Sequence, residues 1–120
     1  MSQSIPQKLK TEVQEFLQAK YPEDEAYRKE LRFNDLYTLL QNGVAHWWFE
    51  KKDGTDRNAF GTLNKDLLEE LIGENDNSSQ SASGQKEFNG VLRYFDVEKM
   101  AWRGLLIDSI LEIDFDYSSI

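Results

Sequence analysis

One segment of this chain reads Phe49-Glu50-Lys51-Lys52-Asp53-Gly54-Thr55-Asp56-Arg57-Asn58-Ala59-Phe60-Gly61-Thr62. An Asp-Gly pair between two short runs rich in aromatic residues is the strongest local sign of a β-hairpin, because Gly and Asp tolerate the positive φ angles of a tight type I′ turn. The segment therefore predicts two antiparallel strands, over about residues 44–52 and 55–63.

A two-residue turn at Asp53 and Gly54 also sets the register of the hairpin. Counting outward, the expected pairs are Lys52 with Thr55, Glu50 with Arg57, Trp48 with Ala59 and Trp47 with Phe60. A Glu–Arg pair across two strands is worth about 0.2 to 1 kcal/mol. We expect the other face to be buried, with Trp47, Phe49 and Phe60, together with Trp102 from a later strand, in the core.

Helical signals precede the hairpin. Apolar residues recur at helical spacing from Ile5 to Leu17, and the pair Tyr21-Pro22 ends that helix because proline pushes the preceding residue out of the α region. Pro22 suits the start of a second helix, for which Tyr27 and Leu31 mark the expected buried stripe. Asn34 is the expected N-cap of a third short helix over 35–42, which Gly43 closes.

The chain after the hairpin predicts one helix and three more strands. Asn64 and Gly73 bracket a helix over 65–72, and the polar segment 74–87 is expected to be a flexible loop. Strands are predicted over about 91–97, 101–106 and 107–115. The fold class is therefore α+β: N-terminal helices over 1–43 and a small SH3-like antiparallel β-barrel over 44–120, as one globular domain.

Two motifs resemble a known family. They are the Lys-Lys-Asp-Gly-Thr turn at 51–55 with Arg57 beyond it, and the later segment from Tyr94 to Arg103 that ends in Trp102-Arg103, followed by residues 106–110. Over about residues 36–113 the chain resembles the WYL-related, Sm-like SH3-barrel proteins found in Bacteroidetes, plasmids and tailed phages. The resemblance implies a fold and a mobile-element setting but no reaction. The chain departs from the family's pattern at Gly104-Leu105.

Composition restricts the function. The 120 residues carry a net charge of −8 and no cysteine, which excludes disulfides, zinc–thiolate sites and cysteine nucleophiles. Residues 41–120 hold eight basic and fifteen acidic groups, so a duplex, which binds Lys and Arg through its phosphates, should be repelled. No apolar run is long enough for a membrane span, and residues 1–10 lack a signal-peptide core, so we expect a cytoplasmic protein.

Catalytic and metal-binding constellations are not apparent. His46 is the one histidine, and a lone histidine beside aromatic residues on a strand is more typical of packing than of catalysis. Asp108, Glu112, Asp114 and Asp116 alternate along one predicted strand, where oxygen ligands could bind a hard cation, but a row of charges usually marks a solvated face. We predict no enzyme activity, no cofactor and no metal.

The candidate partner-binding residues fall into two groups. Arg57 and Arg103 could recognise an anion, a carboxylate or a stacked base through the planar donor fork of the guanidinium group, and Trp48 is a further candidate as a stacking platform. The alternative is purely structural, with Arg57 paired to Glu50 and Arg103 to Asp96 or Glu98. The second group is acidic: Glu69, Glu70, Asp108, Glu112, Asp114 and Asp116.

Three functions follow from these residues. The first is a non-enzymatic interaction module, encoded by a phage or other mobile element, that binds a host protein. The second is an acidic nucleic-acid mimic that inhibits a host nuclease or defence complex through the acidic group. The third is an Sm-like nucleic-acid binder that stacks bases on Trp47, Trp48 or Phe60, which the net charge disfavours.

Overall fold

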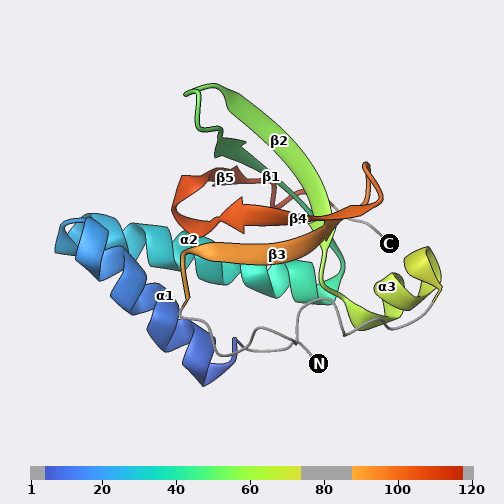
Figure 1. Cartoon of the computed structure of the whole chain (residues 1–120), viewed down its shortest axis with the longest axis horizontal. Coiled ribbons are helices and arrows are strands. Elements are labelled where there is room, and N and C mark those ends of the chain that lie inside the picture. Colours follow the sequence, from blue (N-terminus) through green and yellow to red (C-terminus); the bar gives the residue numbers. More distant parts are fainter. Residues whose placement is uncertain (1–4, 74–87, 118–120) are drawn as a thin grey trace.

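The computed structural model describes residues 5–73 and 88–117, and the predicted loop 74–87 lies outside these ranges. Two helices come first, α1 (Gln7–Lys20) and α2 (Glu23–Asn42), followed by the hairpin β1 (Val44–Glu50) and β2 (Asp56–Thr62). Helix α3 (Lys65–Ile72) separates this hairpin from a second one, β3 (Val91–Asp96) and β4 (Ala101–Leu106). A 3-10 turn, η1 (Ile107–Ser109), then leads into β5 (Ile110–Ile113). Helices α1 and α2 lie at the opposite end of the molecule from the β1–β2 turn (Figure 1).

The five strands form one antiparallel sheet with the order β4-β3-β2-β1-β5. Leu105 of β4 and Ile110 and Ile113 of β5 belong to one buried cluster with Trp47 of β1, although β4 and β5 lie at opposite ends of that order. A flat sheet cannot bring its two edge strands to one core, so the sheet is curled into a barrel. The α+β barrel fold predicted from the sequence is confirmed.

The predicted hairpin register is wrong by one residue. The turn has three residues, because the Lys51 N–H donates to Thr55 O (2.8 Å) and the Gly54 N–H to Lys51 O (2.9 Å). Asp53 Oδ1 accepts hydrogen bonds from the N–H and hydroxyl of Thr55, and Gly54 takes a φ of +90°. A turn followed by one residue of positive φ is the usual three-residue hairpin connection.

The extra turn residue changes every cross-strand partner. Trp47 faces Ala59, Phe49 faces Arg57 and Glu50 faces Asp56, so the predicted Glu50–Arg57 pair does not form. Phe60 faces His46 and lies on the opposite side of the sheet from Trp47. Trp47 is fully buried as predicted, whereas Phe60 and Trp102 stay partly exposed, and Phe49 is partly buried against the core.

Helices α1 and α2 pack against each other and the barrel, through Val13 and Leu17 of α1 and Phe33, Leu36 and Leu40 of α2. The third helix predicted over 35–42 is not separate, because α2 continues unbroken through Asn34. Tyr27 and Leu31 are exposed, not buried as predicted. The buried face of α2 is instead the one that carries Ala26, Glu30 and Phe33. Among the described helices, none is long and apolar enough to cross a membrane.

Residues after β2 cap the end of α2. The last carbonyls of a helix lack partners within it. Here Leu40 O accepts from the Leu63 N–H (2.9 Å), Gln41 O from Asn64 Nδ2 (2.9 Å) and Gly43 O from Thr62 Oγ1 (2.7 Å). Asn64 also caps α3 as predicted, because its Oδ1 accepts from the Leu67 N–H, and Gly73 ends that helix with a φ of +84°.

The predicted strand over 107–115 is also wrong in detail. It begins as the turn η1, and β5 covers only Ile110–Ile113. The register of β5 against β1 shifts between Trp48 and Phe49, so Ile110 and Ile113 are both buried and Leu111 is exposed. This β-bulge removes the simple alternation on which the predicted row of carboxylates depended.

Candidate functional site

A cavity of about 390 Å³ lies between β4 and the end of β1. Its apolar lining comes from Phe49, Tyr94, Leu105 and Leu106, and its polar lining from residues 50–53, Gly104 and Ser109. We call it the seam cavity, because it lies between the edge strand β4 and the end of β1, where β1 no longer pairs with β5. Its volume is within the range of small-ligand sites, which are typically apolar with a few convergent polar groups.

Two exposed arginines, Arg57 and Arg103, lie near Tyr94, which lines the seam cavity, although neither arginine is part of the lining. Arg103 lies opposite Tyr94 in the β3–β4 ladder, and Arg57 lies opposite Phe49 in the β1–β2 ladder. Burial raises the pKa of the Tyr94 hydroxyl, and so does the charge of Asp96, while the guanidinium groups of Arg103 and Arg57 oppose that rise. Both arginines therefore act on the same hydroxyl, from two different hairpins.

The two arginines differ in their partners. Arg103 Nε lies 3.9 Å from Asp96 Oδ2, so the predicted structural pairing with Asp96 is confirmed, at a distance that makes the ion pair a loose one. Asp96 Oδ1 accepts hydrogen bonds from the N–H groups of Glu98 and Lys99. Arg57 is exposed, and within the described ranges no carboxylate lies within ion-pair distance of it.

Lys51 and Lys52 add two further cations to the lining of the cavity. Neither forms an ion pair within residues 5–73 and 88–117. The carboxylates of the lining are Glu50 and Asp53, and Asp56 faces Glu50 across the hairpin. Asp53 already accepts two hydrogen bonds from Thr55. Those hydrogen bonds, with the charge of Lys51, lower the pKa of Asp53. The lining therefore carries two lysines that form no ion pair among the described residues, together with two carboxylates.

His46 joins a cluster that sequence reasoning did not find. Its Nδ1 lies 2.9 Å from Asp114 Oδ2, its Nε2 lies 2.9 Å from Asn58 Nδ2, and its ring stacks on Phe60 with centroids 4.1 Å apart. The hydrogen bond from His46 lowers the pKa of Asp114. The cluster needs the observed register and the bulge in β5, neither of which is readable from the sequence. It ties the chain after β5 to the hairpin.

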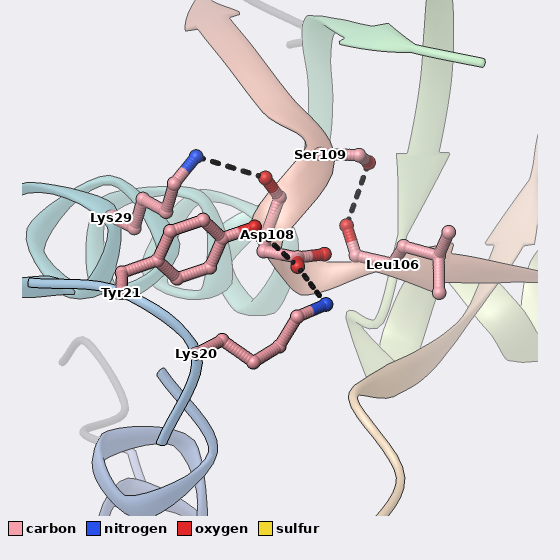
Figure 2. Close-up of polar contacts among 6 residues, drawn as sticks. All are labelled: Lys20, Tyr21, Lys29, Leu106, Asp108 and Ser109. Atoms are coloured by element: carbon pink, nitrogen blue, oxygen red, sulfur yellow. Dashed lines mark hydrogen bonds and ion pairs between the residues drawn. The ribbon is translucent and has the colours of Figure 1, made fainter. Parts of the chain in front are cut away.

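Asp108 is an anchor, not a surface carboxylate. Its Oδ2 accepts hydrogen bonds from Lys20 Nζ and the Tyr21 hydroxyl, both 2.8 Å long, and its carbonyl accepts from Lys29 Nζ (3.2 Å) (Figure 2). Burial alone would raise the pKa of Asp108, but these side-chain hydrogen bonds and the charge of Lys20 hold it below its usual value. Burial and the hydrogen bond to Asp108 raise the pKa of Tyr21 to about 12. We call this group the Asp108 clasp.

The Asp108 clasp also shapes one wall of the seam cavity. Figure 2 shows the clasp beside Leu106 and Ser109, whose carbonyl and hydroxyl form a hydrogen bond of 2.7 Å. Leu106 and Ser109 both line the cavity. The junction of α1 and α2 thereby fixes the turn that ends β4, so the helices determine where the cavity wall lies.

The structure does not bring the six acidic candidates together. Asp108 and Asp114 have the internal partners described above, whereas Glu69 and Glu70 are exposed on α3, Glu112 is exposed on β5 and Asp116 is exposed after it. Among the described residues, no group of three or more carboxylates or histidines could hold a metal ion. The predicted row of carboxylates on one strand is therefore wrong.

The aromatic candidates are largely occupied by internal contacts. Trp47 is completely buried, and Phe60 stacks on His46. Trp48 is partly exposed and packs against His46 with ring centroids 4.6 Å apart. Trp48 and Phe60 are both partly exposed, and each has one ring contact with His46.

The curled five-stranded sheet with helices at one end defines a small SH3-like barrel, open along one seam. The chain belongs to the family described as WYL_2, Sm-like SH3 beta-barrel fold, whose model matches residues 33–111. This match confirms the resemblance seen in the two motifs, and it includes the second half of α2 as well as the barrel.

A phage protein is similar to this chain. It is named "Uncharacterized 11.5 kDa protein in Gp31-cd intergenic region" and comes from Enterobacteria phage T4. The two are 35% identical over 79 residues, which cover 66% of this chain and 74% of the relative. The comparison with solved structures gave no match.

Proposed function

We propose that this protein is a non-enzymatic interaction module of a phage or other mobile element, and that it binds a host protein through the seam cavity. One observation carries the proposal: an apolar cavity of about 390 Å³ is lined by two lysines, Lys51 and Lys52, that form no ion pair with the described residues. Apolar sites rimmed by a few fixed charges are typical of recognition, in which burial supplies affinity and charge supplies specificity. The similarity to a phage T4 protein supports the setting.

The nucleic-acid mimic has weaker support. A mimic must present several carboxylates at the spacing of phosphates, and here Asp108 and Asp114 are engaged inside the molecule. An Sm-like nucleic-acid binder needs free aromatic platforms, and Trp47 and Phe60 are used internally. Both alternatives therefore rest on fewer accessible residues than the sequence indicated.

The experiment is a pull-down from an enterobacterial lysate with the full chain as bait, read by quantitative mass spectrometry. The test variant reverses two exposed cations at the seam, Lys52→Glu with Arg57→Glu. Its matched control reverses two exposed lysines elsewhere, Lys65→Glu with Lys99→Glu, so that both baits have the same net charge.

We expect a host protein that the parent and the control capture and the seam variant does not. Equal capture by both variants, or capture lost equally by both, contradicts a role for the seam. A third variant replaces the exposed carboxylates Glu69, Glu70, Glu112 and Asp116 with their amides. If this variant no longer captures the host protein, and if capture by the parent falls steeply as the salt concentration rises, the result would support the nucleic-acid mimic instead.

A further inference from the structure

We infer that the partner presents an extended acidic segment, which adds as a strand to the free edge of β4 and places an apolar side chain in the seam cavity. This inference rests on the proposed function and names the chemistry of the partner at that same site. Addition of a strand to an exposed sheet edge is a general mode of peptide recognition, in which main-chain hydrogen bonds give affinity and side-chain pockets give specificity.

The edge of β4 has a defined set of free backbone groups. Within the described residues β4 pairs only with β3, with Val91 opposite Leu106 and Arg93 opposite Gly104. The Ile107 N–H donates to Gly90 O (2.9 Å), which identifies Gly90 and Ile107 as a hydrogen-bonded pair. Because such pairs alternate with non-bonded pairs in an antiparallel ladder, the N–H groups of Trp102, Gly104 and Leu106 point away from β3.

The carbonyl groups follow the same alternation. Those of Trp102 and Gly104 point away from β3, and that of Leu106 accepts from the Ser109 hydroxyl. Gly104 lies at the centre of this edge and is exposed, so no side chain of its own covers the backbone. The free groups therefore recur at every second residue, the spacing that an added strand requires.

The opposite wall of the seam leaves space for such a strand. β5 pairs with β1 only as far as Phe49, opposite Ile110, because the preceding residues form η1 and are held by the Asp108 clasp. Beyond Phe49, residues 50–53 line the seam cavity instead of pairing with β5. The barrel is thus unclosed between the end of β1 and the edge of β4.

Charge favours an acidic occupant. Lys51 and Lys52 line the cavity and Arg57 faces Phe49, and none of these three cations forms an ion pair among the described residues. Of the nearby carboxylates, Asp53 and Asp96 already accept hydrogen bonds, which leaves Glu50 and Asp56, facing each other at the end of the hairpin. A second copy of this chain is a poorer occupant, because pairing two β4 edges would bring two sets of these cations together. Like charges across an interface oppose association.

The test uses the full chain and a capped heptapeptide in which aspartate alternates with valine and leucine, with a lysine counterpart as control. Amide exchange and chemical shifts are followed by NMR, with the peptide at up to millimolar concentration. We expect exchange at Trp102, Gly104 and Leu106 to slow by on the order of tenfold, while Ala101, Arg103 and Leu105, already bonded to β3, change little. The lysine peptide should leave all six unchanged.

Two N-methylated versions of the acidic peptide sharpen the result. Methyl groups are placed on alternate backbone nitrogens, so one version blocks the hydrogen bonds toward β4 and the other leaves them intact. We expect one version to bind and the other to fail. Equal binding of the two N-methylated peptides, or no binding of the unmethylated acidic peptide, would overturn the inference. So would a slowing of amide exchange that does not alternate along β4. Amide protection that rises with protein concentration in the absence of peptide would indicate a second copy of the chain and would also overturn it.

The failure of this inference is distinguishable from that of the proposed function. If the host protein from the pull-down still depends on the seam cations but leaves the three amides exchanging freely, strand addition is wrong and the interaction module stands. If the seam variant captures the same proteins as the control, both proposals fall.

Discussion

Gly61 lies so close to the ring of Tyr94 that no side chain fits between them. A Cβ atom at residue 61 would be 2.4 Å from Cδ2 of Tyr94 and 3.1 Å from Cη2 of Trp47. The Trp47 and Tyr94 rings meet edge to face with centroids 5.1 Å apart. Gly61 therefore permits the aromatic contact on which the inner wall of the barrel is built.

Gly61→Ala should destabilise the protein by about 2 to 3 kcal/mol, because the new methyl group forces the two rings apart. The measurement is urea unfolding of the parent and the variant. Tyr94→Leu, alone and combined with Gly61→Ala, completes a double-mutant cycle that should show strong coupling. A Gly61→Ala loss below about 0.5 kcal/mol would contradict the packing described here.

Trp47→Ala and Phe60→Ala should differ in their effect on stability. Trp47 is completely buried, so its truncation should cost about 3 to 5 kcal/mol. Phe60 keeps part of its ring in water, so its truncation should cost about 1 to 2 kcal/mol. Thermal and urea unfolding of both variants measures the difference, and equal losses would argue for the two-residue turn in place of the observed one.

The Asp108 clasp should make stability depend on pH in acid. The pKa of Asp108 is lowered in the folded protein from an ordinary value of 3.8, so its contribution is complete above that value and is lost as the pH falls through the lower, folded pKa. Asp108→Asn should lose about 1.5 to 3 kcal/mol at neutral pH and show a flatter stability profile below pH 4. Asp116→Asn, at an exposed carboxylate, is the control. Parallel profiles for the parent and Asp108→Asn would refute the clasp.

His46→Phe should raise the pKa of Asp114 toward its ordinary value of 3.8. The hydrogen bond from His46 is the largest cause of the lowered pKa, while Phe keeps an aromatic ring against Phe60. Titration of the Asp114 carboxyl carbon by NMR measures the shift directly. An unchanged pKa would mean that the N–H groups of Asp116 and Tyr117 are sufficient to hold it down.

Duplex DNA should not bind measurably at physiological salt. Even non-specific binding with a Kd of about 10⁻⁴ to 10⁻⁶ M needs several phosphate contacts, and the chain carries a net charge of −8. The cations of the seam surround a narrow cavity and do not form the extended surface that a duplex requires. Fluorescence anisotropy with duplex and single-stranded probes at low and moderate salt tests this, and micromolar, salt-sensitive binding would revive the Sm-like alternative.

Local signals were reliable wherever the deciding interactions are local. The Pro22 boundary, the Asn64 cap and the Asp-Gly turn depend on backbone preferences of neighbouring residues, so the sequence predicted the helices at 7–20 and 65–72 and the existence of the hairpin. Asn34 misled because an internal asparagine and an N-cap look alike in a sequence. Packing against the barrel kept α2 continuous through that position.

The candidate site was predictable only in part. The sequence singled out Arg57 and Arg103, yet it could not show that both act on Tyr94 or that an apolar cavity lies beside them. The predicted row of carboxylates failed because Asp108 lies in the turn η1 and a bulge in β5 interrupts the alternating pattern. His46 and Asp114, 68 residues apart, meet only once the register is set.

The sequence by itself determined the composition limits, the order of the strands, the positions of α1 and α3, and the family, because these depend on residue type and spacing along the chain. The tertiary structure alone decided the one-residue register, the partial exposure of Phe60, and the open seam between β1 and β4. The physical reason is that register and closure arise from interactions between distant segments. The Tyr94–Gly61 contact and the Asp108 clasp are two such interactions, and each joins residues more than 30 positions apart in the chain.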